Sequence, residues 1–288
     1  MRLAEEREEP EEVIIRLART LVDEAIAEGW SGPPFDPTVL ASFRGISVEP
    51  AASDIRSDAR IFPLPSGKLQ IEYDPSKPQS RINFSVCHEI AHTFFPDAYE
   101  TSRHRRKQQF QDAEHLQLEW LCDMGAAELL MPHVSFAVDL ALRGTSLQAV
   151  RELRDLYAAS SEAVLIRVSQ LSKEPCAVVF LCEKFKPAEL KASQTAELNL
   201  GLPPIAPKLR VDYVRAASGF SVFIPQDKSV PRDSVTYSCL VTNEIAEGTE
   251  AWDIPGFGKW RVQAVALPNI AEYPRRRVAA LVLPGPVG

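Results

Sequence analysis

The sequence has few cysteines and no long apolar run, the features that mark disulfide-rich and membrane proteins. The five cysteines among its 288 residues are scattered and form no CxxC pair, which is typical of reduced, buried thiols and not of a disulfide framework. No apolar run approaches the length of a membrane-spanning helix, and the N-terminal MRLAEEREEPEE is acidic where a secretory signal is basic and then apolar. We therefore expect a cytoplasmic protein with no membrane association.

An excess of positive charge is also missing. The formal net charge is −7 and the isoelectric point is about 5.4, which argues against a dedicated nucleic-acid or anionic-membrane surface. Hydrophobic residues make up 45% of the chain, enough for well-packed cores. This length predicts either one large domain or two to three smaller ones.

The spacing of apolar residues changes along the chain. Apolar residues recur at helical spacing through most of the first 172 residues, whereas short apolar runs such as CAVVFLC, FSVFIP and SVTYSCLVT follow Pro175 and predict strands. We therefore predict an α+β protein with three parts. These are a mainly helical domain with a small sheet at 1–133, a helical segment at 134–172, and a strand-rich, regulatory C-terminal domain at 173–288.

Residues 59–73 predict a β-hairpin, with ARIFPLP and LQIEYD as its arms and a turn at Ser66-Gly67-Lys68. In the second arm, apolar residues alternate with polar ones, so one face is buried and the other is wet. The strand at 69–73 is a candidate edge strand, onto which an extended peptide could add.

The stretch NFSVCHEIAHTFFPD carries the main chemical signal. Asn83 is a candidate cap of a helix in which His88 and His92 lie four residues apart on one face, as two imidazole ligands of a tetrahedral metal ion require. Glu89 points about 100° away around the helix, where it is poorly placed as a ligand but well placed as a general base. The alternative is a core helix whose two histidines are satisfied by hydrogen bonds.

A second helix, predicted over about 116–131, offers a third ligand. Glu119 lies on this helix, and Asp123 shares its face, where it could orient a ligating histidine. Apolar residues flank both acidic residues, and an unpaired charge in such surroundings costs free energy. The alternative is that both side chains lie on a solvent-exposed face of the helix. Two histidines, one carboxylate and an open fourth position predict a catalytic zinc site.

Other residues near these helices receive different predictions. Glu128 faces the opposite side of the second helix from Glu119, and Glu114 and His115 are weaker alternative ligands because they precede the predicted helix. We assign Cys122 to packing.

These residues resemble the ImmA/IrrE family of metallopeptidases, gluzincin-like proteins that act on phage-type and stress-response repressors. The resemblance covers roughly residues 30–172 and is carried by RINFSVCHEIAHTFF, LEWLCDMGAAELLMP and the upstream IEYDPSKPQSR. One departure from the family is Ala91, where glycine is common. Another is Cys122, at a position that is usually small and apolar.

The resemblance implies a zincin-like fold and one Zn2+ (or Mn2+) per chain. His88, His92 and Glu119 would be the metal ligands, Glu89 the catalytic base and Asp123 the residue that orients a ligand. The segment 134–172 resembles a helix-turn-helix-like unit. It offers only Arg167 and Gln170 as base-reading residues, so direct DNA binding is not expected.

The resulting hypothesis is a metal-dependent endopeptidase that cleaves a helix-turn-helix repressor in stress response or mobile-element regulation. One alternative is a non-enzymatic regulator that binds a repressor or DNA and has a structural or vestigial metal site. A second alternative is a general peptide-degrading enzyme. Metal content and the effect of replacing Glu89 distinguish the first two hypotheses, and the range of peptides cleaved distinguishes the third.

Overall fold

The computed structural model describes residues 8–95, 113–186, 188–189, 206–256, 258–268 and 275–284. The chain divides into two compact units, one formed by Met1–Asp139 and Glu152–Ala163 and the other by Leu140–Arg151 and Val164–Gly288. The helical middle segment thus contributes residues to both units. The predicted boundaries after residues 133 and 172 remain predictions.

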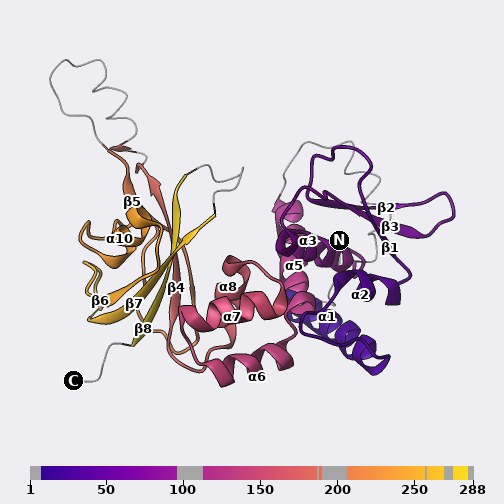
Figure 1. Cartoon of the computed structure of the whole chain (residues 1–288), viewed down its shortest axis with the longest axis horizontal. Coiled ribbons are helices and arrows are strands. Elements are labelled where there is room, and N and C mark those ends of the chain that lie inside the picture. The colour runs from indigo at the N-terminus through magenta and orange to yellow at the C-terminus, as the bar shows by residue number, and fades with distance from the viewer. Residues whose placement is uncertain are drawn as a thin grey trace, which may run out of the picture. The chain divides into compact units, whose positions relative to one another are not determined.

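The first unit combines helices with a small sheet (Figure 1). Its main elements are α1 (Pro10–Ala27), α2 (Pro37–Phe43), β1 (Ser47–Pro50), β2 (Ala59–Pro63), β3 (Leu69–Tyr73), α3 (Gln79–His92) and α5 (Ala113–Leu130). Helices α1, α3 and α5 pack together through a buried cluster that includes Ile14 of α1, Ala91 of α3 and Leu118 of α5. This packing brings the two helices with the predicted ligands side by side.

Helix α3 begins five residues earlier than the sequence pattern predicts. It starts at Gln79 after Pro78, and its last helical residue is His92. Asn83 is therefore not the cap: it is buried inside the helix, where its side chain accepts a hydrogen bond from Gln79 Nε2 (2.8 Å) and donates one to the carbonyl oxygen of Ala158 (3.1 Å). The Asn83 side chain bonds to Ala158, which is distant in the sequence, instead of capping the helix. Sequence alone does not reveal such a partner.

The small sheet confirms the predicted hairpin but corrects the edge-strand prediction. Strands β2 and β3 pair antiparallel, with Ile61 opposite Ile71, and β1 pairs parallel to the other side of β3. The strand order is β1-β3-β2. The strand at 69–73 is therefore the central one, and its backbone has no open edge for a peptide. Strands β1 and β2 form the edges of this sheet.

Helices α6 (His133–Arg143), α7 (Leu147–Tyr157) and α8 (Ser161–Leu171) make up the middle segment. In α8, Arg167 is buried and donates a hydrogen bond from Nη1 to Gln170 Oε1 at 3.3 Å. Its guanidinium is thus committed inside the protein and is unavailable to read a base edge.

The second unit is organised around a five-stranded antiparallel sheet in the order β5-β4-β8-β7-β6 (Figure 1). Its elements are β4 (Ala177–Lys184), β5 (Lys208–Ala216), α10 (Val235–Thr242), β6 (Ala246–Glu250), β7 (Trp260–Leu267) and β8 (Arg277–Pro284). Alternate residues of the sheet, among them Val179, Val211 and Ala280, form the main core of this unit.

Two predicted strands are wrong. Residues 235–242 form helix α10, whose N-terminus is capped by Ser234, and residues 220–225, all of them described, form no strand. The β-branched residues of SVTYSCLVT favoured a strand, but the buried residues are Thr236, Cys239 and Leu240, which is helical spacing. The overall prediction of an α+β fold is confirmed, and the zincin-like and helix-turn-helix-like assignments remain predictions.

Two further expectations concern thiols and membranes. The five cysteines all lie in the described part of the chain, where they are buried and carry no disulfide. Among the described residues, no single helix has the length and apolarity needed to cross a membrane. The bent pair formed by Glu114–Leu130 and His133–Arg143 meets that test by length and composition only.

Candidate metal centre

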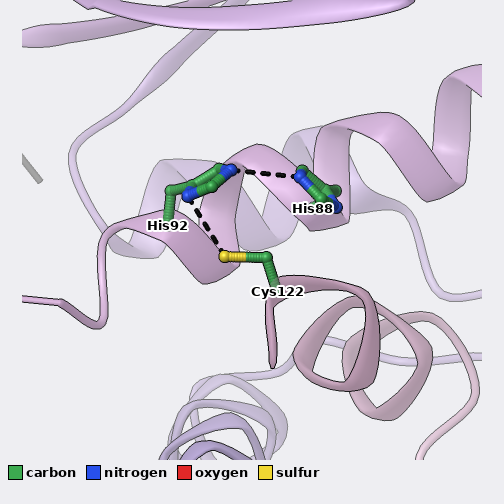
Figure 2. A group of neighbouring side chains, drawn as sticks. All are labelled: His88, His92 and Cys122. Atoms are coloured by element: carbon green, nitrogen blue, oxygen red, sulfur yellow. Dashed lines mark hydrogen bonds between the residues drawn. The ribbon is translucent and has the colours of Figure 1, made fainter. Parts of the chain in front are cut away.

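The two histidines of α3 face one another in the folded chain (Figure 2). Their Nε2 atoms are 3.0 Å apart, and the ring planes meet at 74°. His92 is buried, and the side chain of His88 is 16% exposed. Two ring nitrogens at this distance either share one proton or hold one cation. The spacing of His88 and His92 thus produces a pair of nitrogen donors aimed at one point.

Helix α5 adds a carboxylate to this pair. Glu119 Oε2 is 3.1 Å from His88 Nε2, and Glu119 Oε1 is 3.8 Å from His92 Nε2. In a tetrahedral site with metal–ligand distances of about 2.0–2.1 Å, neighbouring donor atoms lie about 3.3 Å apart. The separations of 3.0, 3.1 and 3.8 Å lie near that value, with a different Glu119 oxygen facing each histidine, and the assignment of Glu119 as the third ligand remains a prediction.

Asp123 lies beside His88 but outside the set of three donors. Its Oδ1 is 2.8 Å from His88 Nδ1, the ring nitrogen that does not face Glu119. A carboxylate at this position fixes the ring orientation and the tautomer in which Nε2 is the donor atom. The structure therefore places Asp123 where the predicted orienting residue belongs.

The side chain of Glu89 contacts the small sheet. It is buried, and its Oε2 accepts a hydrogen bond from the backbone N–H of Ile61 in β2 at 3.1 Å. This contact ties the candidate base to the edge strand of the small sheet. Glu89 thus lies between α3 and β2, and its catalytic role remains a prediction.

Cys122 is the residue whose contact the sequence analysis missed. Its Sγ lies 3.1 Å from His92 Nδ1, and the side chain is buried (Figure 2). Cys122 also belongs to the buried cluster of α1, α3 and α5, as the packing assignment predicts, so it combines packing with a polar contact to His92. A signal was available, because Glu119, Cys122 and Asp123 have the three- and four-residue spacing of one helix face. His88, His92 and Cys122 also form a group close enough to hold a metal ion.

The residues considered as alternative ligands lie outside the group of three donors. Glu114 and His115 lie inside α5, which begins earlier than predicted, and His115 Nδ1 is 3.7 Å from Glu119 Oε1. Glu128 is buried away from this face and pairs with Arg19 Nε at 3.2 Å. The basic run at 104–107 lies outside the described residues.

The electrostatic surroundings of His88 predict how metal binding depends on pH. Burial alone would lower its pKa, but the hydrogen bonds to Asp123 and Glu119 outweigh burial and raise the pKa of His88 to about 9. Below this pH, a metal ion must displace a proton from His88, so its affinity should fall by about tenfold per pH unit. We expect Zn2+ affinity to rise with pH and to level off near pH 9.

Competition with a chromophoric chelator across this range would measure the pH dependence. The Asp123→Asn variant is the control, because loss of the carboxylate should lower the pKa of His88 and shift the plateau to lower pH. An affinity that is independent of pH between about 6.5 and 9 in the wild-type protein would contradict this account of the site.

The distance between the two ligand helices depends on Gly125. A Cβ atom at this position would lie 3.0 Å from Ala91 Cβ and 3.2 Å from Ile14 Cγ1. Overpacking of this kind costs about 1–3 kcal/mol, of which the better helix propensity of alanine offsets about 1 kcal/mol.

Gly125→Ala is therefore expected to lower the melting temperature and to weaken metal binding, because α3 and α5 must move apart. Thermal unfolding with and without Zn2+ measures both effects. Unchanged stability together with unchanged metal affinity would show that the close approach of Gly125 to Ala91 does not set the distance between α3 and α5.

Comparison with known proteins agrees with this geometry. Residues 46–169 match the family described as Peptidase_M78: IrrE N-terminal-like domain, and this range includes every residue of the candidate metal centre. A comparison with curated proteins finds no match. Among solved structures, a Mycobacterium tuberculosis transcriptional regulator is similar, with a TM-score of 0.61 and 13% sequence identity over 94% of this chain and 76% of that chain. At this identity, the similarity shows a shared fold. The segment that carries His88, Glu89, His92 and Glu119 thus matches the model of the IrrE N-terminal-like domain, in agreement with the resemblance to ImmA/IrrE proteins.

Proposed function

We propose that this protein is a metal-dependent endopeptidase of the cytoplasm that cleaves a helix-turn-helix repressor. The observation that carries the proposal is the convergence of two imidazole nitrogens and the Glu119 carboxylate near metal-ligand spacing, on a helix that also carries Glu89 beside His88 in the sequence. The donor set of two nitrogens and one oxygen suits Zn2+ and leaves a coordination position open; Mn2+ is the alternative ion.

The residues of the chain divide the chemistry among them. A divalent cation held by His88, His92 and Glu119 would polarise the scissile carbonyl and activate a water molecule as the nucleophile. Glu89 would serve as the general base that takes a proton from the attacking water and returns it to the leaving amine. Asp123 holds the His88 ring in the orientation that ligation requires.

The substrate segment is proposed to lie along β2. Ile61 directs its backbone N–H to Glu89 and away from β3, so this edge of the sheet faces the helix that carries the candidate base. Zinc peptidases bind substrates as an added strand, with main-chain hydrogen bonds providing affinity. An extended linker of a repressor suits this edge, because a folded segment could not pair with it.

A regulatory setting is supported by two comparisons. The family match names an IrrE N-terminal-like domain, and the similar Mycobacterium tuberculosis protein is described as a transcriptional regulator. The same description also fits the non-enzymatic alternative, in which the protein binds a repressor without cutting it. A regulatory peptidase further requires recognition of its partner outside the cleft, because a broadly active enzyme would damage the cell.

The test is to incubate the purified protein and Zn2+ or Mn2+ with the helix-turn-helix proteins encoded near its gene, and to identify products by mass spectrometry. A single cut that releases the repressor from its operator is the expected result, and Glu89→Gln is the inactive control. Tight binding without cleavage, equal in both variants, would favour the non-enzymatic regulator. Cleavage of many unrelated unfolded peptides would favour a general peptidase.

A further inference from the structure

We propose that Cys122 is a positioning residue that holds His92 in its ligating tautomer by accepting a hydrogen bond from Nδ1–H at its sulfur atom. This inference rests on the metal site of the proposed function and adds a residue to it. The supporting contact is the 3.1 Å separation between Cys122 Sγ and His92 Nδ1 inside the protein (Figure 2).

The tautomer of His92 follows from its two ring contacts. Nε2 lies 3.0 Å from His88 Nε2 and faces Glu119, so it must be unprotonated when it binds a cation. The proton of the neutral ring then resides on Nδ1. Because His92 is only 4% exposed, this N–H donor needs an acceptor inside the protein, and the sulfur of Cys122 occupies that place.

Helix α5 provides each of the two histidines with a contact at its Nδ1 atom. The Asp123 carboxylate lies 2.8 Å from His88 Nδ1, and the neighbouring residue, Cys122, contacts His92 Nδ1. The same helix face carries Glu119, so one helix provides a ligand and both orienting acceptors. Sulfur is a weak acceptor, and the support of His92 is therefore weaker than that of His88.

The competing interpretation is that Cys122 itself binds the metal with His88 and His92. The two nitrogens of an imidazole ring point in divergent directions. An atom that contacts His92 Nδ1 therefore lies away from a cation bound at Nε2, where Glu119 is found. The set made of both Nε2 atoms and Glu119 uses the ring nitrogens that face each other, which favours positioning over ligation.

The test compares variants of the full-length chain in metal affinity, measured by competition with a chromophoric chelator for Zn2+. Removal of a residue that orients a ligand typically lowers metal affinity by about 10–100-fold, and we expect this loss for Cys122→Ala. Cys122→Ser keeps a hydrogen-bond acceptor and should restore most of the affinity. Cys87→Ala is the matched control, because Cys87 is an equally buried thiol on α3 and truncation there should leave the affinity unchanged.

A second measurement separates positioning from ligation and does not depend on the folding of any variant. The wild-type protein is loaded with Co2+, and the near-ultraviolet spectrum is examined for a thiolate-to-cobalt charge-transfer band. The absence of this band, with the predicted order of affinities, supports the proposal. A thiolate band would overturn it, and so would equal Zn2+ affinity in Cys122→Ala and Cys87→Ala. If the wild-type protein binds neither ion, both the inference and the proposed function fail, whereas tight wild-type binding with no effect at Cys122 defeats the inference alone.

Discussion

Replacement of Glu89 by glutamine is expected to leave metal affinity intact and to lower the rate of peptide hydrolysis by about 10²–10⁴-fold, the usual contribution of a general base. The amide has the shape of the carboxylate, and its oxygen can still accept the hydrogen bond from Ile61 N–H. It cannot take a proton from the attacking water. The variant should therefore keep its melting temperature and its bound Zn2+ while losing turnover.

A matched control is Glu114→Gln, which makes the same substitution at an exposed position of α5. Initial rates of repressor cleavage, with metal content determined in the same samples, measure the effect. If Glu89→Gln retained more than about a hundredth of the wild-type rate, Glu89 would not be the general base.

Replacement of Glu119 by alanine should produce the largest change in metal binding. Residues that merely orient ligands contribute about 10–100-fold to affinity, and we expect removal of a ligand to exceed that range. The remaining His88 and His92 would form a two-coordinate site, which is too few ligands for tight zinc binding. Chelator competition with the purified variant measures the loss.

Two carboxylates on the same helix serve as controls for this substitution. Glu114→Ala removes an exposed carboxylate and should leave both metal affinity and stability unchanged. Glu128→Ala should also leave metal affinity unchanged, but it should lower stability, because Arg19 Nε and the His133 backbone N–H lose their acceptor. Equal metal affinity in the Glu119→Ala and Glu114→Ala variants would remove Glu119 from the ligand set.

The parts of the candidate site that sequence could predict are those governed by helix periodicity. His88 and His92 share a face because they are four residues apart, and the same rule pairs Glu119 with Asp123. Apolar neighbours on both sides of these acidic residues predicted that they face the interior, but the side chain of Asp123 is 56% exposed and that of Glu119 is 34% exposed. The contact between Cys122 and His92 depends instead on how α3 crosses α5, which no local spacing determines.

The strand-rich region shows the same division between local and long-range information. Buried strands such as β4 and β8 have continuous apolar runs and were predicted, whereas β6 has the sequence AEGTE and carries little hydrophobic signal. It is an edge strand, held by its pairing with β7. The order of the small sheet was equally hidden, because the parallel pairing of β1 with β3 joins segments that are distant in the sequence.

Ala91 and Gly125 have a consequence for how this site tolerates change during evolution. The two residues face each other where α3 and α5 cross, and a Cβ added at position 125 would lie only 3.0 Å from that of Ala91. Ile14 Cγ1 of α1 would lie 3.2 Å from the same added Cβ, so the methyl of Ala91 is one of two close contacts there. Substitutions at positions 91 and 125 are therefore not expected to be additive, as neighbouring core positions generally are not. Glycine at position 91 would remove one of the two contacts that alanine at position 125 makes, so the cost of a change on one helix depends on the residue that faces it from the other.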